Sequence, residues 1–230
     1  MHRYKPYKKD FDYSYTLGVF LTIELLQVKA DQVIGVIISS NADKNSGLAK
    51  ITELCHLNHI TMDVDDKVIS LLSPKENCYA IGVFIKYNED LEACENHVVL
   101  VNPMDSGNLG TIIRPAVDIF EPKTIRASMG SIFHCKFVNY NCFEDYRSHF
   151  ENYSLYPFLL HGEKTVDQVS TFGKEPYSLI FGNESSGLSE YYRHIGTSIV
   201  IPHSKRIDSL NLSIAAGIAF YEFSKDLVQF

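Results

Sequence analysis

Three short segments combine glycines with polar side chains that can bind a small polar ligand. They are SGNLGTIIR (106–114), IFGNESSGLS (180–189) and SLNLSIAA (209–216). Glycine lets a backbone approach a ligand closely, and arginine, carboxylate, amide and hydroxyl groups can hold phosphate, ribose or another polar group. The side chains that these segments offer for such chemistry are Asn108, Arg114, Glu184, Ser209 and Asn211.

Each segment follows a stretch that is typical of a buried strand, at about 97–101, 177–182 and 197–202. Open α/β sheets bind ligands beyond the carboxyl ends of their strands, so these positions suit a site. Taken singly, each segment is equally compatible with an ordinary structural turn. The first is not a dinucleotide fingerprint, because GNLG lacks the third glycine and the acidic residue that follows it. The third leads into a helix over about 209–223, with Asp208 or Ser209 as its expected N-cap.

The remaining pattern alternates between helix and strand, which is typical of an α/β fold. In the N-terminal part we expect helices over 15–28, 45–58 and 65–73, and strands over 33–40, 60–64 and 77–87. Further strands are expected near 136–139 and 156–160. The polar, acidic stretch 88–96 is the best linker candidate. The predicted domains are therefore 1–90 and 97–230.

Composition restricts the function classes. The chain has 230 residues, 45% of them hydrophobic, and a formal net charge of −7, which argues against coating nucleic acid by charge alone. Its five cysteines never occur as CxxC, so we expect reduced thiols and no metal site. No apolar h-region or run of about 20 apolar residues is present, so we expect a soluble cytoplasmic protein without a membrane span.

Taken in order, SGNLGTIIR, IFGNESSGLS and IPHSKRIDSLNLSIAA resemble the three motifs of the SpoU/TrmH family of RNA ribose 2′-O-methyltransferases, in the SPOUT superfamily. KTIRASMGSIF (123–133) resembles the family's segment between the first two motifs. The resemblance spans about 97–224. The N-terminal part is similar in pattern to the small RNA-binding domain that many members carry in front.

The resemblance implies a C-terminal parallel-sheet SPOUT domain whose chain forms a deep trefoil knot, preceded by a small α/β RNA-binding domain. It implies S-adenosyl-L-methionine (AdoMet) bound in the knot, rRNA or tRNA as substrate, and a homodimer whose active site draws on both subunits. By position, Gly182, Ile201 and Leu210 would contact AdoMet. The polar active-site positions would be Asn108, Arg114, Glu184, Ser209 and Asn211.

A mechanism can be reasoned from these positions. A ribose 2′-hydroxyl is a poor nucleophile until it loses its proton, so catalysis needs alignment and stabilisation of a developing alkoxide. Arg114 is the candidate for that stabilisation, because its very high pKa makes it a poor base. Glu184 would orient Arg114 or a substrate hydroxyl, and Ser209 and Asn211 would position the ligand. Basic residues that fit a modest RNA surface are Arg3, Lys5, Lys8, Lys9, Lys123, Arg126, Lys205 and Arg206.

One segment departs from the family pattern. In the family, the first-motif arginine lies on a full helix followed by a strand, whereas here Pro115 follows Arg114 at once. Proline inside a helix costs about 3 kcal/mol or more, so a helix through both residues is disfavoured. VDIF (117–120) is then either a strand parallel to 97–101 or a loop over a missing helix and strand. This leaves an alternative function, a catalytically weak paralogue that binds RNA or AdoMet. Another kind of α/β nucleotide-binding protein is disfavoured, because the sequence has no P-loop.

Overall fold

The computed structural model describes residues 4–42, 46–73, 77–101, 118–169, 176–183, 185–204, 206 and 208–225. The chain divides into two compact units. The first combines Met1–Glu89 with Asp118–Lys136, and the second combines Asp90–Val117 with Phe137–Phe230. The backbone therefore passes between the units three times. The functional division at 1–90 and 97–230 stays a prediction.

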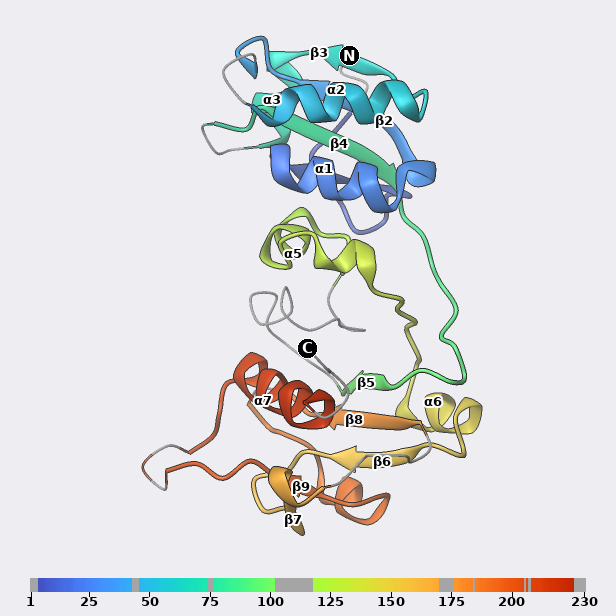
Figure 1. Cartoon of the computed structure of the whole chain (residues 1–230), viewed down its shortest axis with the longest axis vertical. Coiled ribbons are helices and arrows are strands. Elements are labelled where there is room, and N and C mark those ends of the chain that lie inside the picture. Colours follow the sequence, from blue (N-terminus) through green and yellow to red (C-terminus); the bar gives the residue numbers. More distant parts are fainter. Residues whose placement is uncertain are drawn as a thin grey trace. The chain divides into compact units, whose positions relative to one another are not determined.

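The first unit is built on a mixed four-stranded sheet with the order β1-β4-β2-β3 (Figure 1). β4 runs antiparallel to β1 and β2, and β2 runs parallel to β3. The strands are β1 (Tyr13–Leu17), β2 (Val33–Ile38), β3 (Met62–Val64) and β4 (Ala80–Ile85); the helices are α1 (Val19–Val28), α2 (Gly47–Leu57) and α3 (Asp66–Leu72), with a short 3-10 turn η1 (Ala30–Gln32).

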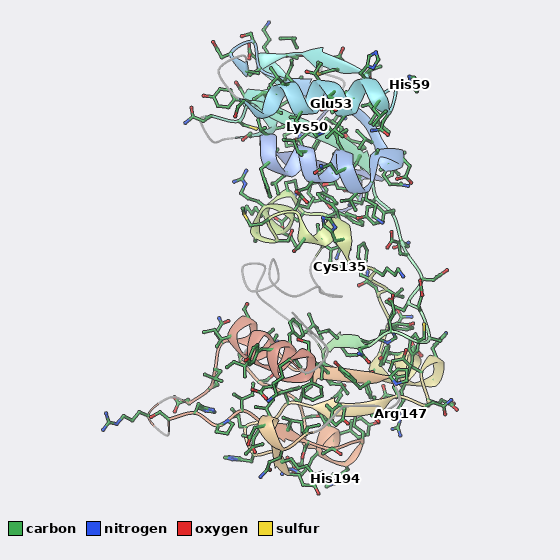
Figure 2. All side chains as sticks on the ribbon, in the orientation of Figure 1. Lys50, Glu53, His59, Cys135, Arg147 and His194 are labelled. Atoms are coloured by element: carbon green, nitrogen blue, oxygen red, sulfur yellow. The ribbon has the colours of Figure 1, made fainter. Side chains whose placement is uncertain are left out.

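The apolar sequence of β4 fits a strand that is buried on both faces. Ile81 and Val83 pack in one cluster with side chains of α3, whereas Ala80 packs in a second cluster with residues of α1 and α2. α1 and α2 lie side by side (Figure 1). On the solvent side of α2, Lys50 and Glu53 form an exposed ion pair of 3.1 Å (Figure 2), a type that adds little stability.

Residues 118–136 complete the first unit, although they come after the first strand of the second. They form α5 (Pro122–Ala127) and the 3-10 helix η3 (Ser131–His134). Phe133 is 1% exposed, and its ring lies 5.7 Å from that of Phe84 in β4. The described part of VDIF, residues 118–120, is a turn and not a strand. The cause is local, since the Asp118 carboxylate accepts a hydrogen bond from the Phe120 amide at 3.1 Å, which closes an Asx turn.

The second unit contains a parallel sheet with the order β5-β8-β6. A parallel bridge between Phe158 and Ile199 links it to the parallel pair β7-β9. The elements are β5 (His97–Leu100), α6 (Phe143–His149), β6 (Ser154–Pro157), β7 (Lys164–Thr165), η4 (Val166–Gln168), β8 (Tyr177–Phe181), η5 (Glu190–His194), β9 (Ile199–Val200) and α7 (Leu212–Ser224).

The central strand β8 again alternates between two apolar layers. Leu179 and Phe181 pack with α7, whereas Ile180 packs with α6. Burial of both faces explains why YSLIF reads as a nearly continuous apolar run. Within the described ranges, no helix has the length and apolarity needed to cross a bilayer.

The α/β class is confirmed, with a mixed sheet in the first unit and a parallel sheet in the second. Two predicted elements are wrong. Residues 15–17 belong to β1 and not to a helix, because they pair with β4 and because Gly18, with φ at 122°, separates strand from helix. Residues 136–139 form no strand. The chain passes there from one unit to the other, so local β preference finds no partner strand.

Candidate functional site

The strands that precede the first two glycine-containing segments, β5 and β8, end side by side. Leu100, at the end of β5, pairs with Phe181, at the end of β8. The next amide, on Val101, donates to the Phe181 carbonyl at 2.8 Å. Because the two strands are parallel, Val101 and Gly182 follow them at the same edge of the sheet. The stretches expected as strands before these two segments are therefore adjacent parallel strands of one sheet.

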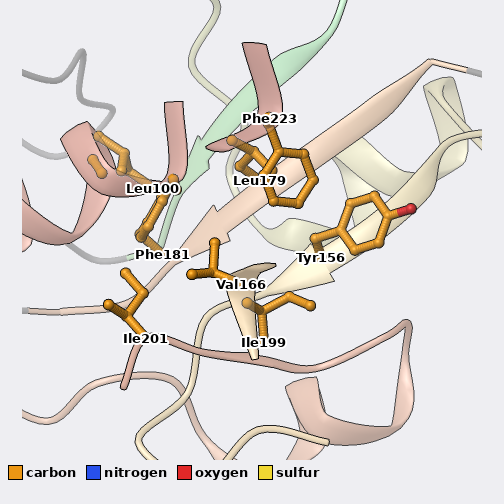
Figure 3. Close-up of a cluster of buried hydrophobic side chains, with 10 residues drawn as sticks. Leu100, Tyr156, Val166, Leu179, Phe181, Ile199, Ile201 and Phe223 are labelled. Carbon is orange, nitrogen blue, oxygen red and sulfur yellow. The ribbon is translucent and has the colours of Figure 1, made fainter. Parts of the chain in front are cut away.

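The third segment joins them through a shared core (Figure 3). Leu100, Phe181 and Ile201 belong to one buried cluster, in which they are 4%, 2% and 9% exposed. Leu210 packs against this cluster as a partly buried residue. The strand ends that precede the three segments therefore meet in a single apolar layer beneath α7.

The loop after β8 is closed by its own backbone. Asn183 and Gly187 exchange two main-chain hydrogen bonds, of 3.2 and 2.8 Å. A Cβ on Gly182 would overlap the backbone of Gly187 and Leu188, so only glycine fits there. Gly187 has φ at 65°, the left-handed region that favours glycine. Both glycines of this segment are therefore required by the path of the loop itself.

Asn183 has a structural role that the sequence interpretation missed. Its side-chain oxygen accepts from the Ser185 amide at 2.9 Å, the Ser185 hydroxyl at 2.7 Å and the Ser186 amide at 3.1 Å. These hydrogen bonds hold the loop itself in shape. The pattern Asn-x-Ser-Ser after a strand is the signal for such an Asx turn.

The third segment places two polar candidates beside the start of α7. Ser209 and Asn211 are both exposed. Asn211 is the N-cap, since its side-chain oxygen accepts from the Ser213 amide at 2.8 Å. The expectation that Asp208 or Ser209 caps this helix is wrong, because the helix begins later, at Leu212, and the cap residue must come just before it.

Of the other predicted site residues, the structure describes Gly182 and Ile201 but not Asn108, Arg114 and Glu184. Gly182 lies at the mouth of its loop, and the Ile201 carbonyl lies 2.8 Å from Nδ1 of His203. The predicted positions Asn108, Arg114 and Glu184 lie outside the described residues, as do Arg3 and Lys205. The structure thus brings Gly182, Ile201 and Leu210 into one region and leaves the placement of the arginine as a prediction.

A buried polar chain lies at the other end of strands β5 and β8. His97 is 6% exposed, and its Nδ1 lies 3.0 Å from the Tyr146 hydroxyl, which lies 2.6 Å from Oγ of Ser178. The His97 ring stacks on Tyr153 at 4.7 Å. Burial lowers the pKa of His97 and raises that of Tyr146, so both groups are neutral near pH 7. This network ties β5, β8 and α6 together away from the loops.

No metal site is apparent in the part of the chain that the structure describes, which contains no group of three or more His, Cys, Asp and Glu side chains able to hold an ion. The chemistry that these residues support is therefore main-chain and side-chain recognition of a polar ligand, at a sheet edge whose floor is apolar.

The sequence matches the model of the SpoU rRNA methylase family over residues 115–221. The chain is 29% identical over 140 residues to an uncharacterised tRNA/rRNA methyltransferase of Synechocystis, covering 54% of this chain and 51% of that protein. It is 26% identical over 177 residues to a 23S rRNA guanosine 2′-O-methyltransferase of Bacillus subtilis, covering 69% of this chain and 70% of that enzyme. The chain thus spans about half the length of the first of these relatives.

Among solved structures, the fold resembles that of an AdoMet-bound rRNA methyltransferase from Sinorhizobium meliloti. The TM-score is 0.77 at 26% identity, covering 95% of this chain and 89% of that one. The family match lies mainly in the second unit, where the glycine loop and the third segment share their core. Together these matches show that residues 115–221 are similar to the SpoU rRNA methylase family and that the fold resembles that of a solved rRNA methyltransferase.

Proposed function

We propose that this protein transfers a methyl group from AdoMet to a ribose 2′-hydroxyl of rRNA or tRNA. The observation that carries the proposal is that the strand ends before the three segments share one buried core, which contains Leu100, Phe181 and Ile201. The Bacillus relative methylates a ribose 2′-oxygen of 23S rRNA, and the Sinorhizobium structure contains AdoMet, which agrees with this assignment.

The described residues fit a nucleoside-like cofactor. The closed loop after Gly182 offers backbone groups, while Ile201 and the partly buried Leu210 supply apolar surface beside it. We assign Gly182, Ile201 and Leu210 to AdoMet binding. When bound, AdoMet supplies a sulfonium methyl group that is already activated for transfer.

The residues of the chain then have to align and deprotonate the hydroxyl. We assign Arg114 to stabilise the developing alkoxide, since a fixed positive charge acts most strongly where negative charge develops. Glu184 would orient that guanidinium or the substrate hydroxyl. Asn108, Ser209 and Asn211 would position the nucleotide by hydrogen bonds.

RNA is the substrate class that this chemistry requires, because a 2′-hydroxyl distinguishes RNA from DNA. We assign RNA binding to the first unit. Lys5, Lys8, Lys9 and Lys123 are exposed there and Arg126 is half-buried, so five cationic side chains are available on an otherwise acidic protein. We also propose that the protein acts in the cytoplasm, because rRNA and tRNA are made and matured where AdoMet is available.

The trefoil knot and the homodimer belong to the same proposal. The outer side of α7 supports the dimer, because Ile214 and Tyr221 are 56% and 67% exposed and lie two helical turns apart on one face. The small residue Gly217 stands between them with open space around it. An apolar helix face of this kind fits a second copy of the chain.

A second candidate, a catalytically weak paralogue, is favoured by a specific observation. The family match begins at Pro115, one residue after Arg114. The alignment with the Bacillus enzyme is 177 positions long, but it includes only 69% of the 230 residues of this chain, or about 159. The Bacillus enzyme therefore has aligned positions at which this chain has no residue. A shortened chain after Arg114 would weaken transfer more than cofactor binding.

The two candidates differ in a direct assay. Calorimetry with AdoMet, followed by transfer of tritiated methyl groups to unmodified rRNA and tRNA, separates them. Alkali-resistant dinucleotides in the product would identify 2′-O-methylation. AdoMet binding without transfer supports the weak paralogue, and no binding of AdoMet contradicts both.

A further inference from the structure

The His203 side chain folds back onto the main chain just after β9. Its ring atom Nδ1 lies 2.8 Å from the carbonyl oxygen of Ile201, two residues earlier, and His203 itself is half-buried. A carbonyl oxygen only accepts hydrogen bonds, so Nδ1 carries a proton and donates it. The proton that the ring gains or loses on titration is therefore the one on Nε2, and the bond to Ile201 exists in both charge states.

The Ile201 carbonyl lies where the chain leaves β9. The next residue, Pro202, has no amide hydrogen to donate. The Ile201 side chain is 9% exposed and belongs to the core that contains Leu100 and Phe181, the last residues of β5 and β8 (Figure 3). A main-chain carbonyl beside such a core needs a donor, since an unpaired buried carbonyl costs free energy comparable to a lost hydrogen bond. His203 supplies that donor from its own side chain.

Both ends of the segment between β9 and α7 are fixed to the second unit. At its start, Ile201 is held by the core and by His203. At its end, Leu210 packs against the same core, and Asn211 caps α7. Ile201 and Leu210 are also the residues assigned to AdoMet. The bond from His203 therefore acts at one of the two points that give this part of the cofactor surface its shape.

We propose that His203 is a positioning residue for AdoMet, whose Nδ1–H group fixes the main chain at Ile201 in the conformation that the cofactor requires. This inference rests on the proposed function for the assignment of Ile201 to AdoMet. His203 acts through the main chain of Ile201 and has no assigned contact with the methyl group or the RNA. The bond preorganises the free protein, so without it each binding event includes the cost of ordering residues 201–203.

A positioning role and a general-base role of His203 predict different pH dependences. A base would act through Nε2, which loses its proton when the ring becomes neutral. The positioning role acts through Nδ1, which keeps its proton in both charge states. The contribution of His203 to AdoMet affinity should therefore agree within about twofold at about pH 6 and at about pH 8.

The test compares His203→Leu with His203→Asn. Leucine has no donor, whereas the side-chain amide nitrogen of asparagine is attached to Cγ, as Nδ1 is in histidine, and can donate to the same carbonyl. We expect the Kd for AdoMet, measured by calorimetry, to rise about fivefold or more in His203→Leu, the effect of losing one hydrogen bond. In His203→Asn the Kd should stay within about twofold of wild type. The kcat at saturating AdoMet and the KM for RNA should change less than about twofold in both variants.

His149→Leu is the matched control in the same unit. Nδ1 of His149 lies 2.7 Å from the Asp145 carbonyl on α6, so this variant removes the same kind of bond from an exposed histidine. The Kd for AdoMet should not change in it. Wild-type affinity in His203→Leu, or an equal loss of affinity in His203→Asn or His149→Leu, would overturn the positioning role. A difference between wild type and His203→Leu that disappears at one of the two pH values would overturn it as well.

Hydrogen exchange provides a readout that needs no cofactor. Amides in a peptide covering 197–204 should exchange faster in His203→Leu than in wild type, His203→Asn or His149→Leu, whereas a peptide covering 177–182 should not change. Unchanged exchange at 197–204 would contradict the proposal. If the wild-type protein binds no AdoMet, the proposed function fails, and the exchange result alone decides whether His203 fixes this part of the chain.

Discussion

Gly182 lies directly against the backbone of Gly187, so that a single added carbon at residue 182 would overlap the Gly187 carbonyl carbon and the Leu188 amide. This contact closes the loop that follows the central strand of the second unit. The parallel pairing of β8 with β5 places the start of this loop beside the end of β5. The glycine is therefore needed for the shape of the site before any ligand is considered.

The first prediction concerns this contact. Gly182→Ala should open the loop, reduce AdoMet affinity by about tenfold or more and lower the stability of the second unit by about 1–3 kcal/mol, as overpacking does. Glu53→Ala, which removes an exposed ion pair on α2 in the first unit, is the control. Calorimetry and urea unfolding measure the two effects. Wild-type affinity in Gly182→Ala would contradict the assignment of this loop to the cofactor.

The second prediction separates two roles of Asn211. Its side chain caps α7, so Asn211→Ala should cost about 1 kcal/mol of unfolding free energy. Asn211→Asp keeps an N-cap acceptor and should keep that stability, yet it removes the amide donors proposed to hold the ligand. Methyl transfer should therefore be lost in both variants, while stability falls only in the first. If Asn211→Asp is fully active, the amide is not needed for catalysis.

The third prediction is a pH dependence of stability that arises from His97. Burial lowers its pKa in the folded protein, so the folded state favours the neutral ring. Near and below the usual pKa of about 6.5 the unfolded chain then binds more protons than the folded one, and the unfolding free energy falls as pH drops. The stability that His97 contributes is fully present above pH 6.5. It is lost as the pH falls from 6.5 towards the lower pKa of the folded state, and the unfolding free energy decreases by no more than about 1.4 kcal/mol per pH unit.

Denaturant unfolding between pH 7.5 and 5 measures the slope of the unfolding free energy against pH. The uptake of about one proton by His97 on unfolding sets this slope. His97→Gln should flatten it, although it also weakens the packing against Tyr153. Ser148→Ala, a change at an exposed residue of α6 that carries no titrating group, should leave the slope unchanged. An equal slope in wild type and His97→Gln would show that another group titrates.

The fourth prediction concerns Arg114. Arg114→Ala should reduce methyl transfer by about 100-fold or more, the effect of removing one preorganised group that stabilises developing charge. AdoMet affinity should stay nearly unchanged, because that ligand is assigned to Gly182, Ile201 and Leu210. Arg193→Ala, which removes an ion pair with Glu190 on η5, is the control. An unchanged rate in Arg114→Ala would show that this arginine is not the catalytic one.

Much of the fold could be predicted because local pattern and burial agree. VIGVII and YSLIF are short apolar runs rich in β-branched or aromatic residues, and each became a strand buried inside its unit. The helix expected over 65–73 is α3 (Asp66–Leu72), and Asp65 is its N-cap, since its side chain accepts from the Val68 amide at 3.0 Å.

The elements that were predicted wrongly have a different cause. Their structure depends on contacts with residues that are distant in the sequence. Residues 15–17 form a strand because β4 offers a free edge, and the tertiary pairing outweighs helical spacing. Residues 136–139 form no strand, where the chain passes from one unit to the other. Residues 118–136 join the first unit through rings such as Phe120 and Phe133, and nothing in their own order reveals that they pack on β4. In the candidate site, the spacing of the glycines indicated the loop after β8. The N-cap at Asn211 could not be predicted in the same way, because it depends on the residue at which packing allows α7 to begin.

The return of residues 118–136 to the first unit has a consequence for a protein that has been cut. A protease that cleaves within 88–96 produces two pieces, and the N-terminal piece still needs Ile125, Phe133 and their neighbours to cover Phe84. Those residues belong to the other piece. The two halves of a nicked chain would thus remain together as a noncovalent complex, and the same break offers a place to divide the protein into complementing fragments.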